Sequence, residues 1–139
     1  MQAAKAKRST GFTLIELMIA IGIVSILAMI AANFYSDNVI SAKRSDARRG
    51  LQDTATSLEK CKSLYGNYNS LNCSIADGAT VSSPEGLYDI QVDTDASTFS
   101  LTATPSAGSS QSADTDCTSM TLDNLGNRGG TGADASACW

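Results

Sequence analysis

The chain has 139 residues, with 10 basic and 14 acidic side chains, four cysteines and no histidine. This length allows one membrane segment and one small domain. Because the chain has no histidine, a Ser-His-Asp site cannot form. The sequence also has no Cys-x-x-Cys pair of the kind that binds zinc or carries out redox chemistry, and no glycine-rich phosphate loop after a strand. We therefore expect neither an enzyme nor a bound cofactor.

The N-terminal third combines a basic leader with a long apolar run. The leader carries Lys5, Lys7 and Arg8, and the run from Phe12 to about Ala32 contains one charged residue, Glu16. A helix from residue 12 to 35 covers roughly 36 Å, enough to cross a hydrocarbon core of about 30 Å. The run therefore predicts a membrane helix with its basic end in the cytoplasm. A carboxylate inside such a helix is costly, so Glu16 is a candidate functional residue.

Residues 7–19, Lys-Arg-Ser-Thr-Gly-Phe-Thr-Leu-Ile-Glu-Leu-Met-Ile, resemble the prepilin signature of the type IV pilin family. The resemblance implies that a membrane prepilin peptidase cuts after Gly11 and N-methylates Phe12, the new first residue. It also implies that Glu16 guides the assembly of subunits into a filament. Other pilin subunits, the peptidase and the inner membrane are then the expected partners.

Two other interpretations explain less of this segment. A cleaved secretory signal also has a basic and an apolar region, but this run is long, contains Glu16, and offers only Ile30-Ala31-Ala32 as a cleavage site. A plain membrane anchor would explain the hydrophobicity and neither Glu16 nor the Gly11–Phe12 junction.

The helix is expected to continue beyond the membrane, over residues 36–65. Less polar residues recur every three or four positions, which predicts one buried face, and Gly66 suits the position after the helix end. This face consists of Ala47, Leu51, Thr54, Leu58, Cys61 and Tyr65. The basic residues Lys43, Arg44, Arg48 and Arg49 suit a solvated face or contacts with neighbouring subunits better than a nucleic-acid or lipid patch. Asn33 stands where many family members have a proline.

Residues 66–139 are expected to form an antiparallel β region, which makes the fold class α+β. Residues 67–85 are predicted as a long loop, and alternating apolar residues predict strands over 88–92, 99–103 and 118–122. The glycine-rich stretch 129–132 is predicted to be flexible. The domain plan is therefore a leader (1–11), a membrane or filament-core helix (12–35), its amphipathic continuation (36–65) and a disulfide-stapled β region (66–139).

Four cysteines allow three pairings. Short loops and the pilin resemblance favour Cys61 with Cys73 and Cys117 with Cys138, with each disulfide worth roughly 3 kcal/mol. Two acidic pairs, Asp93 with Asp95 and Asp114 with Asp116, could bind calcium, but the twelve-residue loop pattern is absent. We expect no metal.

Charge is distributed unevenly. Residues 37–65 carry six basic and four acidic side chains, whereas residues 66–139 carry only Arg128 against nine acids, a net charge of −8. Such a surface repels DNA, so no specific nucleic acid is expected as a partner.

The order of helix, loop, strands and cysteine-bounded tail is similar to that of small minor pilins of the type IVa class, of the PilE type. The predicted function is a structural, minor subunit of a type IVa pilus, made in the inner membrane and then displayed on the extracellular fibre. By the resemblance, such fibres serve twitching motility, adhesion or DNA uptake. The alternatives are a pseudopilin of a type II secretion system and a pilin that is itself a receptor for DNA or another ligand.

Overall fold

The computed structural model describes residues 11–139, and within it the side chains of residues 32–34 and 36 are left out. The basic leader with Lys5, Lys7 and Arg8 lies outside the described residues. The chain divides after Asp37, and Asn38–Trp139, here called the head unit, form a compact body of their own.

One helix, α1 (Leu14–Tyr65), accounts for 52 residues and confirms the expectation of a helix over 12–65. Its segment Leu14–Ala31 is apolar and long enough to cross a membrane, and none of it is buried within the molecule. The helix ends where Gly66 takes a left-handed φ of 84° and its N–H donates to the Lys62 carbonyl at 2.8 Å. Glycine adopts this conformation without steric cost, which explains why α1 stops there.

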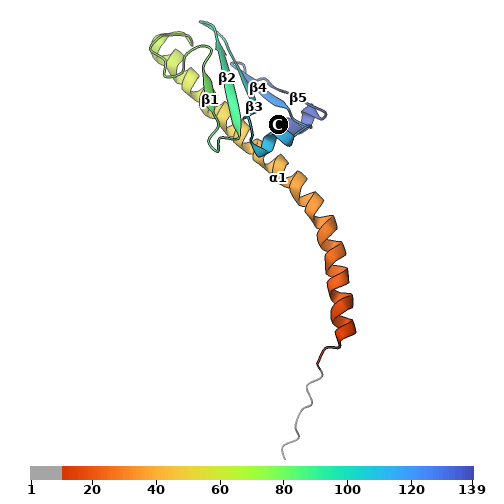
Figure 1. Cartoon of the computed structure of the whole chain (residues 1–139). Coiled ribbons are helices and arrows are strands. Elements are labelled where there is room, and N and C mark those ends of the chain that lie inside the picture. Colours follow the sequence, from red (N-terminus) through yellow and green to blue (C-terminus); the bar gives the residue numbers. More distant parts are fainter. Residues whose placement is uncertain (1–10) are drawn as a thin grey trace, which may run out of the picture. The chain divides into compact units, whose positions relative to one another are not determined.

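The head unit contains a five-stranded antiparallel sheet in the order β1-β2-β3-β4-β5, with the second half of α1 lying across one face (Figure 1). The strands are β1 (Thr80–Ser82), β2 (Tyr88–Thr94), β3 (Phe99–Pro105), β4 (Ser119–Asp123) and β5 (Arg128–Thr131). Two short 3₁₀ helices, η1 (Ser110–Ala113) and η2 (Ala135–Cys138), lie in the connections. The three predicted strands are confirmed as β2, β3 and β4.

The two edge strands contradict the sequence-based expectations. β1 lies in the stretch predicted to be a loop, and β5 contains the glycines predicted to be flexible. Glycine is required in β5 by close packing, because a Cβ on Gly130 would lie 2.6 Å from the Cys138 sulfur. Local composition indicated flexibility, and the tertiary contact fixes a strand instead.

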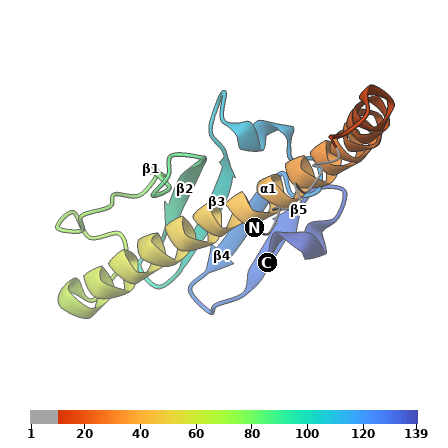
Figure 2. The same ribbon diagram turned by 90° about the horizontal axis from the view of Figure 1, so that it is seen from below.

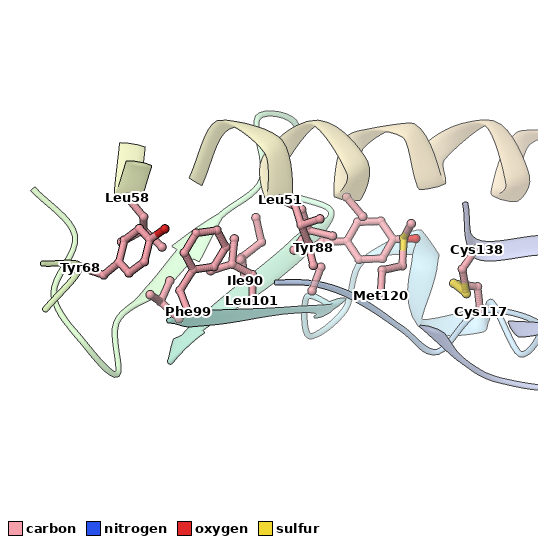
Figure 3. Packing of buried hydrophobic residues seen from close by; sticks show 14 residues of the cluster. Leu51, Leu58, Tyr68, Tyr88, Ile90, Phe99, Leu101, Cys117, Met120 and Cys138 are labelled. Carbon is pink, nitrogen blue, oxygen red and sulfur yellow. A yellow bond between two sulfur atoms is a disulfide. The ribbon is translucent and has the colours of Figure 1, made fainter. Parts of the chain in front are cut away.

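The core lies between α1 and the sheet, where Leu51 and Leu58 point toward Tyr88, Ile90 and Phe99 (Figure 3). Side chains in β2 alternate between buried and more exposed positions, as predicted for a strand with one face on the core. The predicted helix face is buried at five of its six positions. Tyr65 is the exception, with 47% of its surface exposed, because it lies in the last turn of α1.

Two carboxylates tie α1 to the head-unit loops. Buried Asp46 accepts hydrogen bonds from the Ser83 hydroxyl and from the backbone N–H groups of Glu85 at 2.9 Å and Leu87 at 3.3 Å. Asp114 accepts hydrogen bonds from Nε and Nη2 of the buried Arg44 guanidinium, at 2.6 and 2.8 Å. These contacts fix α1 to the β1–β2 connection and to the β3–β4 connection.

Disulfides join Cys61 to Cys73 and Cys117 to Cys138 in the structure. The first ties the C-terminal part of α1 to the loop before β1, and the second ties the residues before β4 to η2. The open face of the sheet, turned away from α1, carries hydroxyl, amide and acidic side chains, including Asp89, Gln91 and Thr102.

Candidate assembly site

The first described turn of the chain places Glu16 directly at the start of α1. Phe12 is 91% exposed and precedes the helix, and Thr13 occupies the N-cap position before Leu14. Both the backbone N–H and the hydroxyl of Thr13 donate to the same oxygen of Glu16, Oε2, at 2.8 Å. The Glu16 N–H in turn donates to the Thr13 hydroxyl at 3.3 Å.

This reciprocal pair is a capping box, in which the N-cap residue and the third helical residue satisfy each other's free groups. The helix N-terminus also favours an anion at this position. Sequence analysis identified Glu16 and missed Thr13. The Thr-x-x-Glu spacing before an apolar helix is the signal that would have revealed it.

No other charged group on this segment can pair with Glu16, because residues 12–36 contain no basic side chain and no second acid. Large apolar side chains surround the helix on every side and are more than half exposed, among them Leu14, Ile19 and Leu27. A helix that is apolar all round is stable in a membrane or among other helices, and unstable in water. Glu16 is therefore the single charged residue of an apolar segment, and Thr13 provides the hydrogen bonds to its carboxylate.

The predicted basic residues are distributed over different tasks in the head unit. Arg44 forms an ion pair with Asp114, and its hydrogen bond holds the pKa of the Asp114 carboxyl below the ordinary value. The Lys43 ammonium donates to the Ser110 hydroxyl at 3.0 Å, and the Arg48 guanidinium donates to the Cys138 carbonyl at 3.0 Å. Arg49 remains exposed. The structure thus separates the four residues that the sequence placed in one run.

Sequence analysis did not foresee a second cluster at the sheet edge formed by β5 and η2. The Arg128 guanidinium lies over the Trp139 ring at 5.0 Å, and the Trp139 indole N–H donates to the Gly129 carbonyl at 2.7 Å. Because Arg48 contacts the carbonyl of the neighbouring Cys138, two guanidinium groups and an indole gather at this edge. We call Arg48, Arg128 and Trp139 the basic edge.

The two candidate calcium pairs lie in different surroundings. Asp114 is committed to Arg44, with Asp116 3.9 Å from the same guanidinium. Asp93 and Asp95 line a shallow surface hollow together with Thr98 and Ser100. Within residues 11–139, no group of three or more cysteine or acidic side chains is placed to hold a metal ion.

Two family models match the chain. One, described as type IV minor pilin ComP, DNA uptake sequence receptor, matches residues 34–121, and the other, described as the prokaryotic N-terminal methylation motif, matches residues 6–32. The chain belongs to this family of type IV minor pilins.

A solved structure supports the same assignment. The chain is similar to a type IV pilin from Shewanella oneidensis, with 29% identity and a TM-score of 0.50 over 72% of this chain and 97% of that one. Among curated proteins, none matches. The pilin prediction from residues 7–19 and the order of elements is confirmed, and so is the minor-subunit class.

Proposed function

We propose that this minor pilin is made as a membrane precursor, cut between Gly11 and Phe12, methylated on Phe12 and then added to a type IV pilus. The methylation-motif match spans this junction and supports the proposal. Before assembly the apolar segment Leu14–Ala31 holds the precursor in the inner membrane, and after assembly it lies among the helices of other subunits. The head unit is then displayed on the outside of the fibre.

The observation that carries the proposal is the Glu16 carboxylate, which Thr13 caps and which is the only charged side chain in residues 12–36. Moving such a group from its cap into a packed apolar core is unfavourable unless an opposite charge receives it. Cleavage at Gly11 creates a free amine at Phe12, and an adjacent subunit can bring its own amine to Glu16. We therefore assign to Glu16 the selection and alignment of subunits during assembly.

Replacement of Glu16 by alanine tests this assignment. The variant should be cleaved and methylated like the wild type, because the junction is unchanged, yet be depleted from sheared fibres relative to the membrane pool. Glu16→Asp is the matched control, since it keeps the charge and shortens the reach. Intact-mass analysis should show a mature protein that begins at Phe12. Equal fibre content of Glu16→Ala and wild type would contradict the role of Glu16.

A second candidate function is that of a DNA receptor, because the matching family is described by that activity. The open face of the sheet does not suit DNA, since Asp89, Asp93 and Asp123 repel phosphates. The basic edge offers guanidinium groups and an indole face, which bind phosphates and bases respectively. We propose this edge as the DNA contact in that case.

Selection from a pool of duplex fragments tests the receptor function, with a polypeptide that lacks residues 1–35. A receptor should retain one sequence at least about a thousandfold more tightly than random duplex. Arg48→Gln with Arg128→Gln should weaken that binding, whereas Lys60→Gln, an exposed position elsewhere on α1, should leave it close to wild type. If no sequence is enriched, the receptor function fails and the pilin assignment stands.

A further inference from the structure

Residues 132–139, here called the tail, are held against α1 by two arginines. Nη1 of Arg44 donates to the Ala137 carbonyl at 3.1 Å, and Nε of Arg48 donates to the Cys138 carbonyl at 3.0 Å. Figure 2 shows β5 and the tail beside α1, at the sheet edge away from β1. Hydrogen bonds from a charged donor are stronger than those between neutral groups. The tail is therefore held through its own backbone, next to one of its cysteines.

The Arg44 guanidinium also reaches the segment that carries the other cysteine of this disulfide. Its Nε and Nη2 donate to Asp114, and Oδ1 of Asp114 in turn accepts the backbone N–H of Cys117 at 3.1 Å. Arg44 is 4% exposed, so these contacts are shielded from water. Figure 3 shows the disulfide between Cys117 and Cys138 beside the core. One buried guanidinium thus connects the two segments that the disulfide joins.

Backbone contacts fix the same alignment. The Ala133 N–H donates to the Thr115 carbonyl at 2.9 Å, and the Asp134 N–H donates to the Asp116 carbonyl at 3.1 Å. The tail passes so close to this segment that a Cβ on Gly132 would overlap the Asp116 carbonyl. These contacts and those of the two arginines involve no sulfur atom. They are therefore available to the chain before the cysteines are oxidised.

We propose that Arg44 and Arg48 position the tail in the reduced chain, so that the fold selects the pairing of Cys117 with Cys138 and the disulfide locks this alignment. Oxidation proceeds by exchange with the disulfide of a small oxidant. One cysteine thiolate attacks the oxidant and releases a first thiol, and the second cysteine thiolate attacks the mixed disulfide and releases the other. Two electrons and two protons pass from the protein thiols to the oxidant, and the held tail favours the second attack.

A redox titration of the full chain in detergent micelles tests this role. The protein is equilibrated with mixtures of reduced and oxidised glutathione, quenched in acid, alkylated and mapped by mass spectrometry. At a given glutathione ratio, Arg48→Gln should lower the ratio of disulfide to dithiol at Cys117 and Cys138 about tenfold, because the tail loses a charged hydrogen bond. Arg49→Gln, at the exposed neighbouring position on α1, should leave the ratio close to wild type. An unchanged ratio in Arg48→Gln would overturn the proposal.

The second disulfide is an internal control in the same molecules. Cys61 and Cys73 lie at the other end of the α1 segment in the head unit, away from the tail, and their ratio should not change in Arg48→Gln. An equal loss at both disulfides would show general destabilisation and would also overturn the proposal. Arg44 is not substituted in this test, because its removal leaves the buried Asp114 carboxylate unpaired.

Trp139 provides a second readout, because it is the only tryptophan and belongs to the tail. Its indole N–H donates to the Gly129 carbonyl at 2.7 Å when the tail is docked. In the variant Cys117→Ser with Cys138→Ser, the emission of Trp139 should stay close to that of the wild type. Adding Arg48→Gln should shift the emission to longer wavelength and increase its quenching by acrylamide. Emission typical of an exposed indole in the serine variant itself would show that the disulfide, and not the arginines, holds the tail.

Discussion

Residue by residue, the chemistry of this pilin depends on a few polar groups whose partners are nearby. Glu16 is held by Thr13, Asp46 by the residues around Ser83, and Asp114 by Arg44. In each case a carboxylate in apolar surroundings has a donor supplied by the fold. These three hydrogen-bonded carboxylates have different roles in the protein. Asp46 and Asp114 hold the head unit together, whereas the Thr13–Glu16 pair lies at the start of the apolar segment that we propose moves from the membrane into the fibre.

Removal of the Thr13 hydroxyl should impair incorporation into fibres. Thr13→Val keeps the shape of the side chain and loses its hydrogen bonds to Glu16, which costs the helix N-terminus about 1 kcal/mol. The carboxylate then has fewer partners in the membrane, and the variant should be present at a reduced level in sheared fibres. Thr13→Ser, which restores the hydroxyl, should recover the wild-type level. If Thr13→Val reaches the same level in sheared fibres as Thr13→Ser, the hydroxyl is not needed for incorporation.

The Arg44–Asp114 pair should make the stability of the head unit dependent on acid. Arg44 lowers the pKa of Asp114 below its ordinary value of 3.8, so the charged form contributes stability above that pH. This contribution is lost as the pH falls below about 4 and through the lowered pKa. Denaturant titrations at a series of pH values should show this loss.

The variant that isolates this pair is Asp114→Ala, which leaves the buried guanidinium unpaired. It should be destabilised by about 3–5 kcal/mol at neutral pH and show a smaller further loss in acid. Asp116→Asn is the control, because its side chain is 61% exposed and lies 3.9 Å from the same guanidinium. It should change stability little. If Asp114→Ala and Asp116→Asn lose the same free energy of unfolding at pH 7, the Arg44–Asp114 pair is not the source of this stability.

At the scale of elements, β5 depends on contacts rather than on its own sequence. A Cβ at Gly130 would lie 2.6 Å from the sulfur and 2.9 Å from the Cβ of Cys138, within a disulfide that cannot move freely. Gly130→Ala should therefore displace β5 or η2 and lower the denaturation midpoint of the oxidised protein. At Gly129 the added Cβ would meet only the Thr121 hydroxyl oxygen, the end of a side chain that can rotate. Gly129→Ala should cost less, and the reverse order would contradict this account.

The elements that could be predicted from sequence are those with a strong period. The 3.6-residue pattern from Ala47 to Cys61 and the alternation over β2, β3 and β4 each report a buried face, and the structure buries those faces. β1 and β5 escaped prediction because they are short and owe their pairing to neighbours far along the chain. At the site, Glu16 was visible because charge is rare in an apolar run. The basic edge was not, because it joins residues separated by about ninety positions along the chain.

For the whole molecule, the distribution of charge decides what the fibre surface can attract. The region after α1 carries nine acids and one arginine. Of the basic residues on α1, Arg44 is buried in an ion pair, and Lys62 lies over the Tyr68 ring at 4.3 Å. Arg44 and its partner Asp114 are both buried and neutralise each other, so the exposed surface keeps the acidic excess of the sequence. A polyanion of arbitrary sequence should meet repulsion over most of the head unit.

The acidic surface should keep the affinity of the head unit for random duplex DNA low. A polypeptide lacking residues 1–35 should bind random duplex DNA with a dissociation constant no tighter than about 10⁻⁴ to 10⁻⁶ M at physiological salt, the range of non-specific contacts. If the basic edge makes the contact, the logarithm of the affinity should fall with the logarithm of salt at about −0.9 per phosphate, and the slope should be shallower in Arg128→Gln. Fluorescence anisotropy over a range of salt concentrations measures both quantities. Nanomolar binding of random duplex would show that local contacts at the basic edge override the acidic field, and it would make DNA capture a general property of this head unit.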